Sequence, residues 1–398
     1  MKQTRLYSQS FMFLTGGHFL QALGYSSLLL LPLYLGHLGA NRALTGSIMA
    51  FASLTSLLFR PAVAWSLDVW GRKPTLYVGT STMVLGMWLL FWVEDLGYLI
   101  YVSRFLVGLG LGALFTGYLA FAGDIIPLHR RTEGLAIFGI SGLLPLLINP
   151  FSSKLGIAPV DLRWFLPVVG FVIAASMLFL IPIKETVQVQ ERKSFRWNDV
   201  LQTLISPSLR PVWLAAIILS GLVASFMTFV TVSAKDRGIE GATYVWLSYA
   251  GAAVLVRLFG SRLADRIGPA NLIVPGLSCY ALAMVWFSQA YTFEVLLWAG
   301  GLAGIGHGYI FPVVSGQVIA RASEAHRGSA LSMFTALWSL TEICITPLLG
   351  AFADRFGDPA MFTLTASSAA LLLVFWALLE HRYGPVKSSP SMEVMDPA

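Results

Sequence analysis

Long apolar stretches recur along almost the whole of this 398-residue chain, and they constrain its fold more than any other feature. An α-helix needs roughly 20 apolar residues to cross the hydrocarbon core of a bilayer, and it satisfies its own backbone hydrogen bonds there. Stretches of about that length or longer run approximately over 9–37, 43–66, 75–93, 97–122, 133–153, 162–183, 211–233, 243–263, 270–290, 293–319, 328–352 and 358–380. The pattern predicts an all-α membrane protein with twelve transmembrane helices. The first stretch is too long for a cleaved signal peptide, so we expect it to be retained.

The composition agrees with a lipid environment. Hydrophobic residues make up 56% of the chain and charged residues only 12%, whereas about a quarter of the residues of a soluble domain are charged. The net charge of +6 could suggest a nucleic-acid partner, but that would require basic residues clustered on one face. Here they recur in short loops instead. We therefore expect the chain to lie in a lipid bilayer, and we expect no nucleic-acid partner.

The distribution of Lys and Arg predicts the orientation of the chain. Twelve crossings place both termini on the same side, and that side carries 17 of the 26 basic residues, against six in the opposite loops. Basic residues favour the cytoplasmic side of short loops. We expect cytoplasmic termini in a multi-pass plasma membrane protein, and the compact loops without an Asn-x-Ser/Thr sequon favour a bacterial inner membrane.

A charged segment in the middle of the chain divides it into two halves. Residues 184–210 carry five Lys or Arg residues and interrupt the otherwise short connections. We predict an N-terminal six-helix bundle over 1–183, a cytoplasmic linker over 184–210, a C-terminal six-helix bundle over 211–382 and a cytoplasmic tail over 383–398.

The two halves are related by an internal repeat. A shift of 197 positions superimposes five pairs of residues: Arg60 on Arg257, Asp68 on Asp265, Gly71 on Gly268, Arg130 on Arg327, and Pro150 on Pro347. Parallel repeats of six helices imply a pseudo-twofold axis along the membrane normal, with a solute site near the midplane between the repeats. The repeat therefore predicts a carrier that works by alternating access.

Three motifs resemble those of the major facilitator superfamily. The segment from Ala64 to Lys73, Ala-Trp-Ser-Leu-Asp-Val-Trp-Gly-Arg-Lys, is similar to the loop signature between helices 2 and 3 of that family. A second copy runs from Gly260 to Gly268, and Arg104 opens a glycine-rich segment similar to the family's helix-4 motif. The resemblance implies a twelve-helix transporter of the drug- or metabolite-efflux type.

The resemblance also implies a gating role for the loop signature and its second copy. Asp68 would meet the start of the eleventh helix near Arg327 and Gly328, and Asp265 would meet Arg130 and Arg131. Gly71 suits a tight turn with positive φ. Alternatively, the basic residues of the loops only enforce topology. The candidate gating residues are Asp68, Gly71, Arg72, Lys73, Asp265, Arg266 and Gly268.

Ionisable side chains inside the spans are candidates for function, because insertion of each costs about 2.5–3.5 kcal/mol. On the first helix, His18, Gln21 and Tyr25 share one face. By resemblance this helix lines the cavity, so that face either contacts solute or forms interhelical hydrogen bonds. Arg104 lies inside the fourth helix. It either serves coupling or the cavity, as the resemblance implies, or extends toward the outer surface.

Three further candidates lie on helices 10 and 11. His307 is flanked by glycines, and a histidine can exchange a proton near neutral pH, although a packed neutral ring is the alternative. Trp338 is a further candidate for solute binding or coupling. Glu342 follows it by one turn and is the only carboxylate near the centre of a span. It is the leading candidate for a proton carrier; otherwise it fixes helix 11 by a salt bridge or hydrogen bond. For Arg60 and Arg257 we favour bracing of the helices, with anion binding as the alternative.

The favoured function is secondary active transport of a small, amphipathic organic solute, directed outward and linked to protons. The fifth span ends in Asn149-Pro150-Phe151-Ser152-Ser153 and lacks the glycine-rich motif of proton-driven exporters, so an uptake carrier, a uniporter or a non-transporting receptor remain alternatives. No His-Glu-x-x-His motif, nucleophile elbow or phosphate-binding loop indicates an enzyme or a primary pump. We expect no metal or other cofactor, and a monomer.

Overall fold

The computed structural model describes residues 6–127, 130–186, 202–260, 267–323 and 326–384. Over these residues the chain forms α-helices and short 3-10 turns, without a strand. The α-helices are α1 (Gln9–Ser27), α2 (Leu31–His37), α3 (Arg42–Leu58), α4 (Arg60–Val69), α5 (Arg72–Leu89), α6 (Tyr98–Ile125), α7 (Arg131–Ile140), α8 (Ile148–Lys154), α9 (Leu162–Leu180), α11 (Arg210–Asp236), α12 (Val245–Phe259), α14 (Ile273–Ser288), α15 (Phe293–Arg321), α16 (Arg327–Phe356) and α17 (Asp358–Tyr383).

These helices account for the expected membrane crossings. Within the described residues, eleven helical segments are long and apolar enough to span a bilayer, and α3 with α4 makes a twelfth. Several crossings are interrupted. Helices α7 and α8 form one span through the 3-10 turn η4 (Leu144–Leu147), which carries Pro145 in its first turn, where the missing N–H is tolerated.

The second crossing is bent by 47° between α3 and α4. Pro61 lies in the first turn of α4 and lacks the N–H that a continuous helix would use at this point. The bend directs α4 against α5 and α6 of its own half. The preceding helix, α3, packs along α16 of the other half.

The buried apolar side chains form two clusters. One draws only on residues 6–183, and the other lies almost wholly within 209–376. Three residues of the first half, Leu29, Leu143 and Leu146, belong to the second cluster and mark where the halves are in contact. Helix α11 is 94% buried over its apolar window, against 33% for α12 and α17, so it lies in the interior of the C-terminal half.

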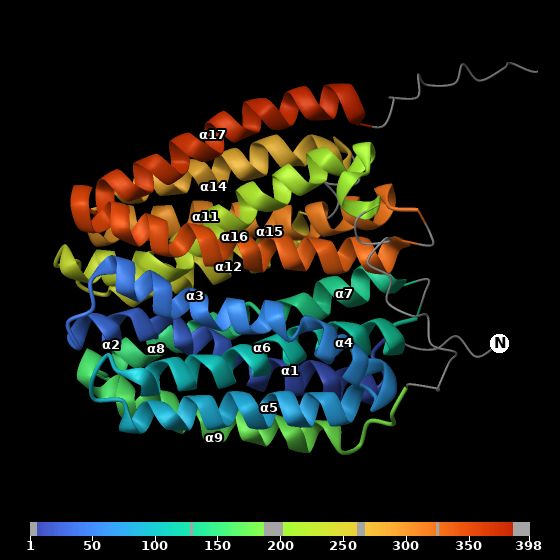
Figure 1. Ribbon diagram of the computed structural model, residues 1–398, viewed down its shortest axis with the longest axis horizontal. Helices are drawn as coiled ribbons and strands as arrows, with labels where there is room; N and C mark the ends of the chain where they lie inside the picture. The colour runs from blue at the N-terminus through green and yellow to red at the C-terminus, as the bar shows by residue number, and fades with distance from the viewer. Residues whose placement is uncertain (1–5, 128–129, 187–201, 261–266, 324–325, 385–398) are drawn as a thin grey trace, which may run out of the picture.

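The two halves lie side by side (Figure 1), with α1 to α9 in the lower part of the view and α11 to α17 in the upper part. They meet mainly where α3 packs along α16 and where α12 packs on η4, α7 and α8. We call the end of the bundle that contains Val69, Ile125 and Tyr383 the linker end, and the end that contains His37, Lys154 and Asp236 the far end.

At the far end the halves are held together by Arg42. Its guanidinium pairs with Asp236 at 2.6 Å and with Asp358 at 2.8 Å, both from the C-terminal half. The carboxylate of Asp354 accepts hydrogen bonds from the backbone N–H groups of Arg42 and Ala43, at the start of α3. Carboxylates are favourable at a helix N-terminus, where backbone N–H groups lack helical partners. These contacts close the far end.

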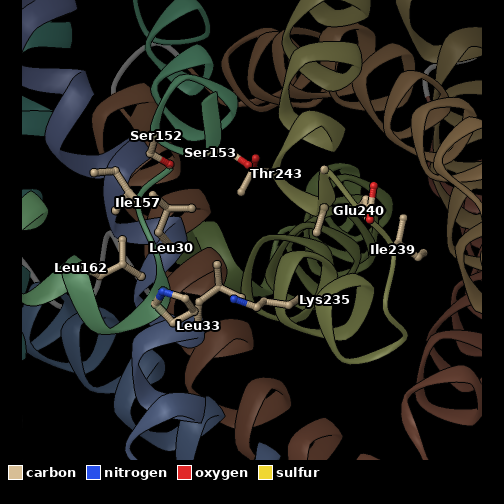
Figure 2. A pocket seen from close by; sticks show the side chains of 13 residues that line it. Leu30, Leu33, Ser152, Ser153, Ile157, Leu162, Lys235, Ile239, Glu240 and Thr243 are labelled. Carbon is tan, nitrogen blue, oxygen red and sulfur yellow. The ribbon is translucent and has the colours of Figure 1, made fainter. Parts of the chain in front are cut away.

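The seam between the halves contains a pocket of about 240 Å³ at the far end. Figure 2 shows Leu30 and Ser152 of the N-terminal half on one side of it and Lys235 and Glu240 of the C-terminal half on the other. None of the candidate site residues lines this pocket. It lies between residues of both halves.

Candidate functional site

The loop signature binds its own half. Gly71 has a φ of +105° and Gly268, its repeat counterpart, has +87°, a region that glycine enters without strain. The Nε of Arg72 donates to Asp124 at 3.0 Å, and the backbone N–H groups of Arg72 and Lys73 donate to the carboxylate of Glu185 at 3.0 and 2.9 Å. The signature thus joins the linker ends of α5, α6 and α9.

The side chains at Arg327 and Gly328, which the sequence places near Asp68, lie outside the part of the chain that the structure describes. The side chain of Asp68 is 77% exposed, and its ion-pair partner is Arg72, at 3.5 Å. The bend before α4 places this helix, which carries Asp68, beside α5 and α6 of its own half. Asp265 and Arg266, in the second copy, lie outside the described residues.

Arg104 is deeply buried between α6 and α3. Only 4% of it is exposed; its Nε donates to the carbonyl oxygen of Ile48 at 3.2 Å and one Nη to that of Met49 at 2.9 Å. Gly108, one turn later, brings α6 against the backbone of α3 at Ala52. Arg104 therefore does not extend to the outer surface: it ties α6 to the helix that forms the seam.

Glu342 lies on the seam itself. The Oγ of Ser53, on α3, donates to its carboxylate at 2.8 Å, so the contact joins the N-terminal half to the C-terminal half. Arg104 and Tyr25 are close enough to interact with Glu342 electrostatically. A carboxylate in this position can exchange a proton and can also alter the contact between the halves, since the charged and neutral forms differ in hydrogen bonding.

An aromatic row on the C-terminal half leads toward Glu342. His307 is hydrogen-bonded through Nδ1 to the hydroxyl of Tyr249, and its ring centroid lies 5.8 Å from that of Phe311. Phe311 in turn lies 5.8 Å from Trp338, which is one helical turn before Glu342. His307, Phe311 and Trp338 are each partly exposed. They offer ring faces and edges for an apolar solute.

The three residues expected on one face of the first helix, His18, Gln21 and Tyr25, have different surroundings. The Nδ1 of His18 is 2.7 Å from the hydroxyl of Ser141, and its ring stacks on Phe138. Gln21 is buried against Met83. Tyr25, in contrast, is 39% exposed. The structure thus places Tyr25 within electrostatic range of Glu342, and it holds His18 and Gln21 inside the N-terminal half.

The repeat-related arginines both reach across the seam. The guanidinium of Arg60 donates to the hydroxyls of Thr335 and Ser339 on α16. That of Arg257 packs on Gly139 of α7, its Cζ lying 3.4 Å from the position that a Cβ would take there. The buried Nε of each arginine has no hydrogen-bond partner. Sequence reasoning identified both residues by their repeat, but not these partners.

Other features of the site were not visible in the sequence. Ser53 and Phe311 carry no motif, and only packing reveals that they contact Glu342 and Trp338. Asp124, at the linker end of α6, likewise carries no motif, and it accepts a hydrogen bond from Arg72. Across the described ranges, no cluster of three or more His, Cys, Asp or Glu residues could hold a metal ion.

Two helical halves with ionisable and aromatic side chains between them are the arrangement expected for a membrane transporter. The sequence pattern of the major facilitator superfamily matches residues 14–290 and 234–395, and the chain belongs to that family. This membership makes it a multi-pass membrane transporter rather than an enzyme. The family resemblance carried by the loop signature is thereby confirmed.

Among curated relatives, the chain is 25% identical over 393 residues to the multidrug resistance protein MdtG of Enterobacter lignolyticus, covering 94% of this chain and 91% of that one. Among solved structures, it resembles a POT family transporter in complex with 5-aminolevulinic acid (TM-score 0.80, 12% identity, 96% of this chain and 99% of that one). It also resembles the nucleoside transporter NupG (TM-score 0.74, 15% identity, 93% and 98%). These structures support the fold.

Proposed function

We propose that this protein is a proton-coupled secondary transporter that exports small amphipathic organic solutes by alternating access. The observation that carries the proposal is the position of Glu342, whose carboxylate accepts a hydrogen bond from Ser53 across the seam. A proton carrier must be linked to the movement of the two halves, and this carboxylate is part of their contact. The name of the MdtG relative supports outward transport of drug-like solutes.

The closed far end supports a working cycle. We propose that the linker end faces the cytoplasm of a bacterial cell, as the bias of basic residues indicates. The structure, with Arg42 bound to Asp236 and Asp358, is then the state closed toward the outside. Protonation of Glu342 would weaken the charge-assisted bond from Ser53 and allow α3 and α16 to separate there. Outward opening requires the Arg42 contacts to break as well.

The solute would bind between the halves, beside the aromatic row. His307, Phe311 and Trp338 offer ring surface there, and the partly exposed Tyr25 adds a hydroxyl within electrostatic range of Glu342. Such a lining suits an amphipathic molecule better than a sugar, since sugar recognition needs many hydrogen-bonding groups. We propose that a single chain carries the complete pathway.

Flux into proteoliposomes under an imposed pH gradient tests this function. A panel of amphipathic drugs and metabolites is compared for the wild type, Glu342→Gln and Glu94→Gln; Glu94 pairs with Arg163 at the exposed far end. We expect gradient-driven flux in the wild type and the Glu94 variant. In Glu342→Gln it should fall to the level of protein-free vesicles, because glutamine cannot carry the proton, while solute exchange without a gradient should persist.

Other outcomes contradict parts of the proposal. Flux that ignores the gradient and is unchanged in Glu342→Gln would make the protein a uniporter. If panel members bind but none is transported, the proposed transport function is wrong.

A further inference from the structure

The seam contains more positive charge than the described residues neutralise. Arg60, Arg104 and Arg257 lie within spans, whereas Glu342 is the carboxylate near the centre of a span. The ion pairs of the described chain involve other arginines, all at the two ends: Arg42, Arg72, Arg130, Arg163 and Arg321. Cations inside a bilayer are costly and normally have a partner of opposite charge or line a polar cavity.

The three arginines are not equivalent. Arg104 donates through Nε and one Nη to two carbonyl oxygens of its own half, which suits a permanent structural bond, and only its other Nη has no partner. Arg60 reaches only hydroxyl groups of the other half, at Thr335 and Ser339. No described side chain or carbonyl accepts a hydrogen bond from Arg257, which packs on Gly139. The latter two contacts join opposite halves, which move relative to each other in the proposed cycle, so they are poorly suited to permanent bracing.

The aromatic row lies between these two arginines. Arg257 is within electrostatic range of Tyr249 and His307, at one end of the row. Trp338, at the other end, directly precedes Ser339, to which Arg60 donates at 3.3 Å. The row itself runs from His307 through Phe311 to Trp338 in steps of 5.8 Å between ring centroids. A cation thus stands at each end of an apolar, partly exposed surface.

We propose that Arg60 and Arg257 form an anion-recognition site and that the solute class is an aromatic or similarly flat organic anion. The inference rests on the proposed transport function and names its substrate class. A carboxylate or sulfonate would accept from the unpartnered guanidinium N–H groups, whose planar fork suits such anions. The body of the solute would lie against Phe311 and Trp338. Because the two arginines come from opposite halves, one anion can contact both halves.

Three probes with the same ring system and different charge test the proposal. Equilibrium binding of radiolabelled 2-naphthoate, 2-naphthamide and 2-naphthylmethylammonium is measured on the full-length protein in phosphatidylcholine nanodiscs. We expect saturable binding of naphthoate, about tenfold or more tighter than that of the neutral amide, and the weakest binding for the ammonium. The amide serves as the measure of ring packing without charge.

The variants Arg60→Gln and Arg257→Gln should each weaken naphthoate binding about tenfold while leaving amide binding within about twofold. Arg60→Lys and Arg257→Lys retain the charge without the fork and should give intermediate values. Arg163→Gln removes an arginine from a far-end ion pair and is the matched control, expected to behave as the wild type.

Three results would overturn the site: no saturable binding of naphthoate, tighter binding of the amide or ammonium, or an equal loss of all three probes in the glutamine variants. Flux measured on the same preparations separates this failure from failure of the transport proposal. Transport restricted to neutral or cationic solutes would support the transport function and overturn the anion site. Preferential naphthoate binding without any flux would support the anion site and overturn the transport function.

Discussion

At the residue scale, Arg104 shows how a charged side chain is accommodated inside the bundle. The carbonyl oxygens of Ile48 and Met49 accept from its guanidinium because Gly108 lets α6 approach α3 closely. The sequence indicated that Arg104 needed an acceptor, but it could not show which one. Backbone carbonyls are present at every position, and only the packing of two helices selects a pair of them.

Removal of this side chain should destabilise the protein. We expect Arg104→Ala to lower the free energy of unfolding by about 3 kcal/mol, because hydrogen bonds from a charged group contribute about 1.5–3 kcal/mol each. The measurement is denaturant unfolding in detergent, with Arg163→Ala as the control. That arginine is partly exposed in a pair with Glu94, so its loss should cost at most about 1 kcal/mol. Equal losses in the two variants would contradict a special role for Arg104.

At the element scale, hydropathy predicted the spans well and their bends poorly. The eleven spans and the bent pair coincide with the apolar stretches, since a lipid environment requires long apolar helices. The 47° bend was not predicted, although Pro61 was visible, because a proline near a helix start can either begin a helix or break one. The bend also places α4, which carries Asp68, beside α5 and α6 of its own half.

The close contact of α3 and α16 gives a second test of stability. A Cβ on Gly46 would lie 2.5 Å from the carbonyl oxygen of Thr346, so Gly46→Ala must push the helices apart. We expect a loss of about 1–3 kcal/mol, typical of overpacking. Gly301→Ala is the matched control, because no atom lies within 4 Å of the position of its Cβ. Thermal unfolding in detergent distinguishes the variants, and equal midpoints would show that the helices are not closely packed there.

At the scale of the whole molecule, the two halves and the repeat can be recognised in the sequence. The contacts between the halves, in contrast, depend on the conformational state of the carrier. A contact such as that of Ser53 with Glu342 joins residues from opposite halves, and no local pattern links them. The contact expected for Asp68 at the start of α16 concerns the linker end. In this structure the far end is the closed one, through Arg42. A sequence encodes every state of such a carrier, whereas one structure shows a single state.

The central claim is that the two ends open in turn, and paired distance measurements test it most directly. Spin labels at Leu155 and Glu294 report on the far end, and labels at Trp70 and Phe259 on the linker end, after replacement of Cys279 and Cys344. We predict that acid pH together with a transported solute lengthens the far-end distance and shortens the linker-end distance. Distances that stay constant under all conditions, or that change in the same direction at both ends, would contradict alternating access.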